Sequence, residues 1–137
     1  MSEPRVRDWM HGGVVACRPD TPVTDVARMM SAHHISALVV TDGAGLAVGV
    51  ISRTDLANAS YVEAYFSHWR GMEARHLMTS PVVSVRPETP VAAAIALLRE
   101  RRIHRLVVTE SAPGGETPVG ILSMTDIIAR MEVPSHG

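Results

Sequence analysis

The sequence contains an internal repeat, and self-similarity at a fixed distance indicates two copies of one structural unit. Leu38-Val39-Val40 recurs as Leu106-Val107-Val108, and Gly49-Val50-Ile51-Ser52 recurs as Gly120-Ile121-Leu122-Ser123 at a slightly longer spacing. The extra residues lie in the Gly- and Pro-containing stretch 110–117, which predicts a surface loop. One copy alone has too little core to be stable, so the two are expected to pack together.

Each copy predicts the same order of elements: strand, helix, strand, strand, helix. The first strands are expected in 14–17 and 82–85, and Thr21 and Thr89 stand where a helix N-cap belongs, each followed by a proline. The later strands are almost wholly apolar, which is typical of sheets buried on both faces. The sequence therefore predicts an α+β fold (α/β) of two β-α-β-β-α repeats packed sheet to sheet about a pseudo-two-fold axis.

The expected limits of the repeats are residues 6–60 and 76–131, joined by a linker helix over 61–75. Helical spacing places Tyr61, Tyr65 and Trp69 on one stripe beside Phe66. Such a stripe favours packing between repeats or subunits, and docking of an effector protein is the alternative.

Composition excludes several classes of function. The net charge of −1 gives no basic field for nucleic acid or a membrane surface, and no apolar run approaches the roughly 18 residues of a membrane span. The N-terminus is charged and lacks an apolar leader, and the single Cys17 allows neither an internal disulfide nor a zinc knuckle. We expect a cytoplasmic protein without a metal site. Since common catalytic fingerprints are also absent, we expect no enzymatic activity.

Two segments in register carry a family resemblance. Gly49-Val50-Ile51-Ser52-Arg53-Thr54-Asp55-Leu56 and Gly120-Ile121-Leu122-Ser123-Met124-Thr125-Asp126-Ile127 both resemble the end of a CBS domain, the repeat named for cystathionine β-synthase. The resemblance covers about residues 6–131, a tandem CBS pair or Bateman module. It implies a regulatory, metabolite-sensing module that binds AMP, ADP, ATP, S-adenosylmethionine or NAD(H) in clefts between the repeats, with no cofactor required.

The resemblance also implies roles for individual residues. Asp55 and Asp126, each at a helix start, would accept hydrogen bonds from two ribose hydroxyls. The residues expected near phosphate or hydroxyl oxygens are Ser52, Arg53, Thr54, His104, Arg105, Ser123 and Thr125. Aliphatic side chains of Val14, Val15, Val82 and Val83 would surround the adenine. A purely structural alternative is that each Ser-x-x-Asp forms a variant capping box, which does not exclude ligand contact.

The two sites are not expected to be equivalent. His104 and Arg105 precede a strand of the second repeat where the first repeat has Ser36 and Ala37, so a fixed cation for phosphate is expected only there. Arg53 compensates partly in the first repeat. We therefore expect tighter adenylate binding at Asp126, with Asp55 weak or empty.

Two readings of the whole chain remain open. The chain is either an adenosine-metabolite sensor, homodimeric and coupled to an effector protein, or a dimerisation and protein-interaction module without a small molecule. His11 is expected to be an ordinary surface residue.

Overall fold

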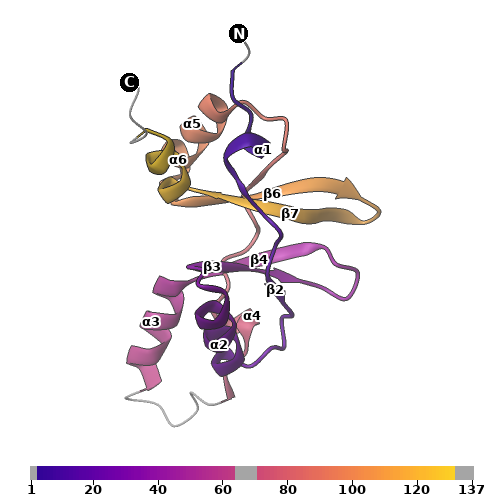
Figure 1. Ribbon diagram of the computed structural model, residues 1–137. Coiled ribbons are helices and arrows are strands. Elements are labelled where there is room, and N and C mark those ends of the chain that lie inside the picture. Colours follow the sequence, from indigo (N-terminus) through magenta and orange to yellow (C-terminus); the bar gives the residue numbers. More distant parts are fainter. Residues whose placement is uncertain (1–2, 64–70, 132–137) are drawn as a thin grey trace. The chain divides into compact units, whose positions relative to one another are not determined.

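The computed structural model describes residues 3–63 and 71–131 (Figure 1). These residues form two compact units. The first-repeat unit runs from Val15 to Val82, and the second-repeat unit combines the N-terminal segment up to Val14 with the chain from Val83 onward. The compact units therefore do not coincide with the sequence repeats.

The first-repeat unit holds a three-stranded sheet in the order β2-β3-β4. Strand β2 is parallel to β3, and β3 is antiparallel to β4. The turn between β3 and β4 is held by Asp42, whose Oδ1 accepts hydrogen bonds from the backbone N–H groups of Ala44 and Leu46. Its elements are β2 (Ala16–Cys17), α2 (Val23–His33), β3 (Ala37–Thr41), β4 (Ala47–Ser52), α3 (Arg53–Glu63) and α4 (Ala74–Leu77).

The second-repeat unit repeats this topology with one more strand, in the order β1-β7-β6-β5. Strand β5 is parallel to β6, while β6 and β1 are antiparallel to β7. Its elements are α1 (Val6–Trp9), β1 (His11–Gly12), β5 (Ser84–Val85), α5 (Val91–Arg101), β6 (Arg105–Ala112), β7 (Gly115–Ser123) and α6 (Met124–Met131). The predicted α+β class and the strand, helix, strand, strand, helix order are confirmed in both repeats.

The loop predicted over 110–117 is wrong. Strand β6 continues to Ala112 and β7 begins at Gly115, with Glu110 opposite Thr117 and Ser111 opposite Glu116. The extra residues lengthen the hairpin because cross-strand backbone pairing outweighs the low strand propensity of this polar, Gly-containing segment.

The predicted threonine caps are also wrong. The N-cap residues are Pro22 and Pro90, and neither helix has a side-chain cap. Thr21 Oγ1 instead accepts a hydrogen bond from the backbone N–H of Arg18 at 2.9 Å, and Thr89 Oγ1 accepts one from Arg86 at 3.2 Å. Each threonine thus closes the turn before the helix, which is the competing use that such hydroxyls have near helix starts.

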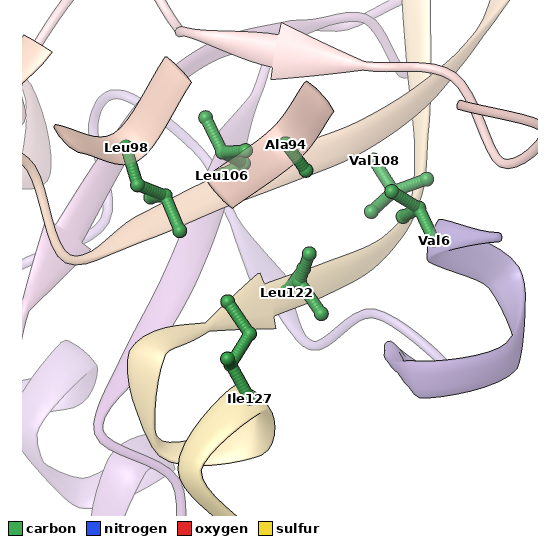
Figure 2. Close-up of a cluster of buried hydrophobic side chains, with 7 residues drawn as sticks. All are labelled: Val6, Ala94, Leu98, Leu106, Val108, Leu122 and Ile127. Atoms are coloured by element: carbon green, nitrogen blue, oxygen red, sulfur yellow. The ribbon is translucent and has the colours of Figure 1, made fainter. Parts of the chain in front are cut away.

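Each unit has its own buried core. In the second-repeat unit, side chains from three helices and two strands converge on one cluster (Figure 2). Its fully buried members are Val6, Ala94, Leu98, Leu106, Val108, Leu122 and Ile127. The corresponding cluster of the first-repeat unit contains Cys17, Val26, Met30, Leu38, Val40, Ile51 and Ala74. Val39 and Val107, which alternate with these strand residues, are also buried, so both sheet faces are covered as the sequence predicts.

The short segment that leads into each repeat packs in the unit of the other repeat. Val6 of α1 lies in the core of the second-repeat unit, and Ala74 of α4 lies in the core of the first-repeat unit. After α1, β1 pairs with β7; after α4, Thr79 makes an isolated bridge with Val50 of β4. The sequence repeats therefore exchange their leading segments.

The predicted linker is described only in part. Helix α3 reaches Glu63 and α4 begins at Ala74. Tyr65, Phe66 and Trp69 lie outside the described residues, as does the side chain of Tyr61, so the aromatic stripe and the repeat limits stay predictions.

Candidate functional site

Asp55 lies at the start of helix α3, directly after β4, as predicted. Its Oδ2 accepts hydrogen bonds from the backbone N–H of Ser52 at 2.7 Å and from Ser52 Oγ at 2.9 Å. In return, the backbone N–H of Asp55 donates to Ser52 Oγ at 3.2 Å. Within residues 3–63 and 71–131, Oδ1 of this half-buried carboxylate has no hydrogen-bond or ion-pair partner. Asp55 therefore presents one oriented acceptor oxygen.

Asp126 repeats this geometry at the start of α6. Its Oδ2 accepts from the Ser123 backbone N–H at 2.8 Å and from Ser123 Oγ at 2.9 Å, and its own N–H donates to Ser123 Oγ at 3.2 Å. The reciprocal bonds satisfy backbone groups at the helix end, so the variant capping box is present at both sites. It fixes both carboxylates and uses only one oxygen of each.

The predicted phosphate-side residues lie beside these helix starts. In the second-repeat unit Arg105 is the strand partner of Ser123, and the carbonyl of His104 accepts from the backbone N–H of Met124 at 2.8 Å. The side chains of His104 and Thr125 are exposed and that of Arg105 is half-buried. A cation therefore stands one strand away from Ser123.

The first-repeat unit has the same backbone arrangement without that cation. Ala37 is the strand partner of Ser52, and the carbonyl of Ser36 accepts from the backbone N–H of Arg53 at 2.8 Å. Arg53 and Thr54 are exposed on the first turn of α3. The predicted correspondence of Ser36 and Ala37 with His104 and Arg105 is confirmed.

The valines predicted near the adenine lie where the chain passes from one compact unit to the other. All four, Val14, Val15, Val82 and Val83, are half-buried. The strands predicted over 14–17 and 82–85 contain only their last two residues, but the carbonyls of Val15 and Val83 still accept hydrogen bonds from the backbone N–H groups of Val39 and Val107. Their contact with a ligand stays a prediction.

Sequence reasoning missed His11. Its Nε2 lies 2.5 Å from Asp126 Oδ1, although 78% of the His11 side chain is exposed and only 7% of that of Asp126. His11 is thus a surface residue, as expected, but it also engages the predicted ribose acceptor. The sequence aligns His11 with Thr79 of the second repeat, because Met10 and Met78 precede them, but this alignment does not indicate a contact with Asp126.

The glycine that opens each motif is required by close packing. A Cβ on Gly49 would lie 2.5 Å from Met78 Sδ, and a Cβ on Gly120 would lie 2.7 Å from both Met10 Sδ and the carbonyl oxygen of His11. Both glycines lie inside strands, so they admit the exchanged leading segments rather than form turns.

A second polar cluster lies in the lengthened hairpin. Glu116 Oε1 accepts hydrogen bonds from the hydroxyls of Thr109 and of Ser84, the latter at 3.0 Å, and Oε2 lies 3.5 Å from Arg86 Nη2. The Thr109 hydrogen bond, followed by that of Ser84, holds the pKa of Glu116 below its ordinary value, and the Arg86 charge acts in the same direction. The cluster ties β5 to the hairpin.

Other candidate chemistry is weak. Burial raises the pKa of the Cys17 thiol to about 11, which keeps it protonated and unreactive at neutral pH. No group of three or more His, Cys, Asp or Glu side chains within the described ranges is arranged to hold a metal ion. In the same ranges, every helix is too short or too polar to cross a membrane.

The repeated carboxylate sites agree with the comparison to protein families. The CBS domain model matches twice, at residues 6–61 and 74–133. This chain belongs to the CBS domain family. The paired matches confirm the predicted tandem arrangement.

Three similar proteins show where such pairs occur. Inosine-5′-monophosphate dehydrogenase from Mycobacterium tuberculosis is 26% identical over 121 residues, which are 88% of this chain and 21% of that enzyme. The chain thus spans about a fifth of the length of this curated relative. The CBS domain pair of protein MJ0100, solved with 5′-methylthioadenosine and S-adenosyl-L-methionine, superimposes with a TM-score of 0.82 at 20% identity, covering 95% of this chain and 97% of that one. CBSX2 in complex with AMP has a TM-score of 0.75 at 27% identity, covering 93% and 95%.

Proposed function

We propose that this CBS pair is a regulatory module that binds an adenosine-containing metabolite through its ribose. The observation that carries the proposal is the geometry of Asp55 and Asp126, each of which is held at a helix start by its serine while Oδ1 takes no part in that capping pair. An oriented carboxylate oxygen is a strong acceptor for a sugar hydroxyl, because a hydrogen bond to a charged acceptor is about twice as strong as a neutral one.

The remaining ligand contacts follow from the neighbours of each carboxylate. His104 and Arg105 are suited to a phosphate or another anionic group beside Asp126, and Arg53 with Thr54 is suited to one beside Asp55. Val14, Val15, Val82 and Val83 are proposed to contact the adenine. The ligand candidates remain AMP, ADP, ATP, S-adenosylmethionine and NAD(H); AMP is favoured as the first probe because CBSX2, solved with AMP, is 27% identical.

The module is proposed to regulate rather than catalyse. The similarity to inosine-5′-monophosphate dehydrogenase covers only 21% of that enzyme, and the chain has none of the nucleotide or nucleophile fingerprints sought in its sequence. Regulation requires a ligand to bind two conformations with different affinity, so the signal is proposed to pass to an effector protein or to self-association. A cytoplasmic location stays a prediction.

Thermal unfolding tests the proposal. AMP present at 100 times its dissociation constant is expected to add about 2.7 kcal/mol of stability. The matched control ligand is 2′-deoxy-AMP, which lacks one of the two ribose hydroxyls and is expected to bind at least about tenfold more weakly. No shift with millimolar AMP, ADP, ATP, S-adenosylmethionine or NADH contradicts the proposal.

A second candidate function rests on α6. Met124, Ile128 and Met131 recur at helical spacing with exposed fractions of 36%, 46% and 74%. Such a face is suited to a homodimer that needs no small molecule. Light scattering at tens of micromolar tests it: a strict monomer excludes the dimer, and a dimer that responds to no nucleotide favours this function over sensing.

A further inference from the structure

The two ribose acceptors differ in the residue that faces Oδ1. At Asp126 both carboxylate oxygens are engaged within the chain, Oδ2 by Ser123 and Oδ1 by His11 Nε2 at 2.5 Å. At Asp55 the corresponding position is that of Thr79, and no described residue bonds to Oδ1. A ribose hydroxyl that reaches Asp126 Oδ1 therefore competes with the His11 imidazole for the same oxygen.

Backbone pairing fixes the position of His11. In β1, His11 is the strand partner of Ile121 and Gly12 that of Gly120, which sets the imidazole near the end of β7 where Asp126 begins its helix. Met10 packs on the bare Cα of Gly120, beside the backbone carbonyl of His11. The donor is thus held at the carboxylate by two neighbouring contacts and does not depend on a flexible loop.

The homologous segment of the first-repeat unit has the same backbone role without the donor. The backbone N–H of Thr79 donates to the Val50 carbonyl at 2.9 Å, and the N–H of Val50 donates back at 3.1 Å. Met78 lies on Gly49 as Met10 lies on Gly120. The difference between the sites is therefore the side chain at one aligned position, an imidazole in one and a short hydroxyl in the other.

We infer that His11 is an internal competitor for the ribose at Asp126, so that the first adenosine ligand binds through Asp55. This inference rests on the proposed function and reverses the order of affinity expected from His104 and Arg105. Arg105 still favours an anionic ligand at Asp126, but only after the imidazole has left. His11 thereby makes the two sites of one module unequal, and its removal is expected to reveal the second.

Calorimetric titration with AMP tests the inference on the full chain. Wild type is expected to bind one AMP per chain, and Asp55→Asn to weaken that site at least about tenfold, the factor that corresponds to about 1.4 kcal/mol. Asp126→Asn is expected to weaken the binding of this first AMP less than Asp55→Asn does. Asparagine suits both positions because its carbonyl still accepts the serine N–H of the capping pair. Circular dichroism on each variant checks that the fold is retained.

His11→Ala is the decisive variant. It is expected to bind a second AMP, which His11→Ala combined with Asp126→Asn loses again, while the matched control Thr79→Ala titrates like wild type. A side chain with a merely structural role would not add a binding site. The inference is overturned if His11→Ala titrates like wild type, if wild type already binds two AMP, or if Asp126→Asn removes the wild-type site.

The proposed function fails in a distinguishable way. If neither wild type nor His11→Ala binds AMP or S-adenosylmethionine, both carboxylates are capping residues only. If wild type binds through Asp55 and His11→Ala changes nothing, sensing stands and the competition by His11 is wrong.

Discussion

The Asp55 and Asp126 sites agree in every contact within the motif and differ in what reaches them from outside it. The three hydrogen bonds that tie each aspartate to its serine measure 2.7, 2.9 and 3.2 Å at Asp55 and 2.8, 2.9 and 3.2 Å at Asp126. The partner of Oδ1, in contrast, is the His11 imidazole at one site and no described residue at the other. Contacts within the motif are thus preserved by the duplication, whereas contacts with the exchanged leading segment have diverged.

The comparison predicts that the cores are equal even though the sites are not. Leu122 and Ile51 occupy aligned strand positions and are both 0% exposed. Leu122→Ala and Ile51→Ala are therefore each expected to lower the free energy of unfolding by about 2–5 kcal/mol, measured by urea denaturation. Glu100→Ala at an exposed position of α5 is the control, with a change within about 0.5 kcal/mol. A large loss of unfolding free energy in one of these variants and none in the other contradicts the equivalence of the cores.

Gly120 and Gly49 are expected to tolerate a side chain to different degrees, because different atoms surround them. In Gly120→Ala the new Cβ meets the backbone oxygen of His11 at 2.7 Å, and we expect a loss of about 1–3 kcal/mol with displacement of β1. In Gly49→Ala the close atoms all belong to the Met78 side chain, which moves more easily, so the loss is expected to be smaller. Thermal unfolding of both variants checks the order.

Gly120→Ala also tests His11 by an independent route. Displacing β1 withdraws the imidazole from Asp126, so this variant is expected to gain the second AMP site that His11→Ala gains. The opposite order, with Gly49→Ala less stable than Gly120→Ala, contradicts this. It means that β1 moves away from Gly120 more easily than the Met78 side chain moves away from Gly49, and that β1 does not hold His11 in place.

Sequence reasoning reached the parts of the fold that local patterns determine. The repeat, the order of elements and the position of Asp55 and Asp126 at helix starts all follow from periodicity and from spacing within a few residues. The pairing of Ser52 with Asp55 was available as a capping alternative for the same reason. These features need no knowledge of which distant segments meet.

Two of the missed features depend on long-range pairing, and one is local. Nothing in the sequence of β1 indicates that it pairs with β7, which lies near the other end of the chain, so the role of His11 was hidden. The polar residues around Glu116 predict a loop, but the hydroxyls of Thr109 and Ser84 donate to that carboxylate from neighbouring strands, which the local sequence does not indicate. The local feature is the hydrogen bond of Thr21 and Thr89, because a turn and a helix cap can use the same hydroxyl and here the turn uses it.

The smallest expected effect concerns the Glu116 cluster, which has no counterpart among the described residues of the first-repeat unit. There Ala16 pairs with Val39 as Ser84 pairs with Val107, so the equivalent hydroxyl is missing, and Thr41 Oγ1 donates to the backbone carbonyl of Cys17 at 3.5 Å. Hydroxyl donors hold the pKa of Glu116 below its ordinary value of 4.5. A lowered folded-state pKa stabilises the fold above pH 4.5, and that contribution is lost as the pH falls through the folded value.

Glu116→Gln is therefore expected to unfold at a slightly lower temperature than wild type at pH 7. This gap in unfolding temperature is expected to close as the pH drops below 4.5. The effect is small because 41% of the Glu116 side chain is exposed to solvent, which weakens its ion pair with Arg86. Glu110→Gln, at an exposed position of the same hairpin, is the control and is expected to show no such closing gap. A gap that stays constant from pH 7 to pH 3 means that Glu116 acts through shape and hydrogen bonding alone, and the charge of the cluster then contributes nothing to the difference between the two units.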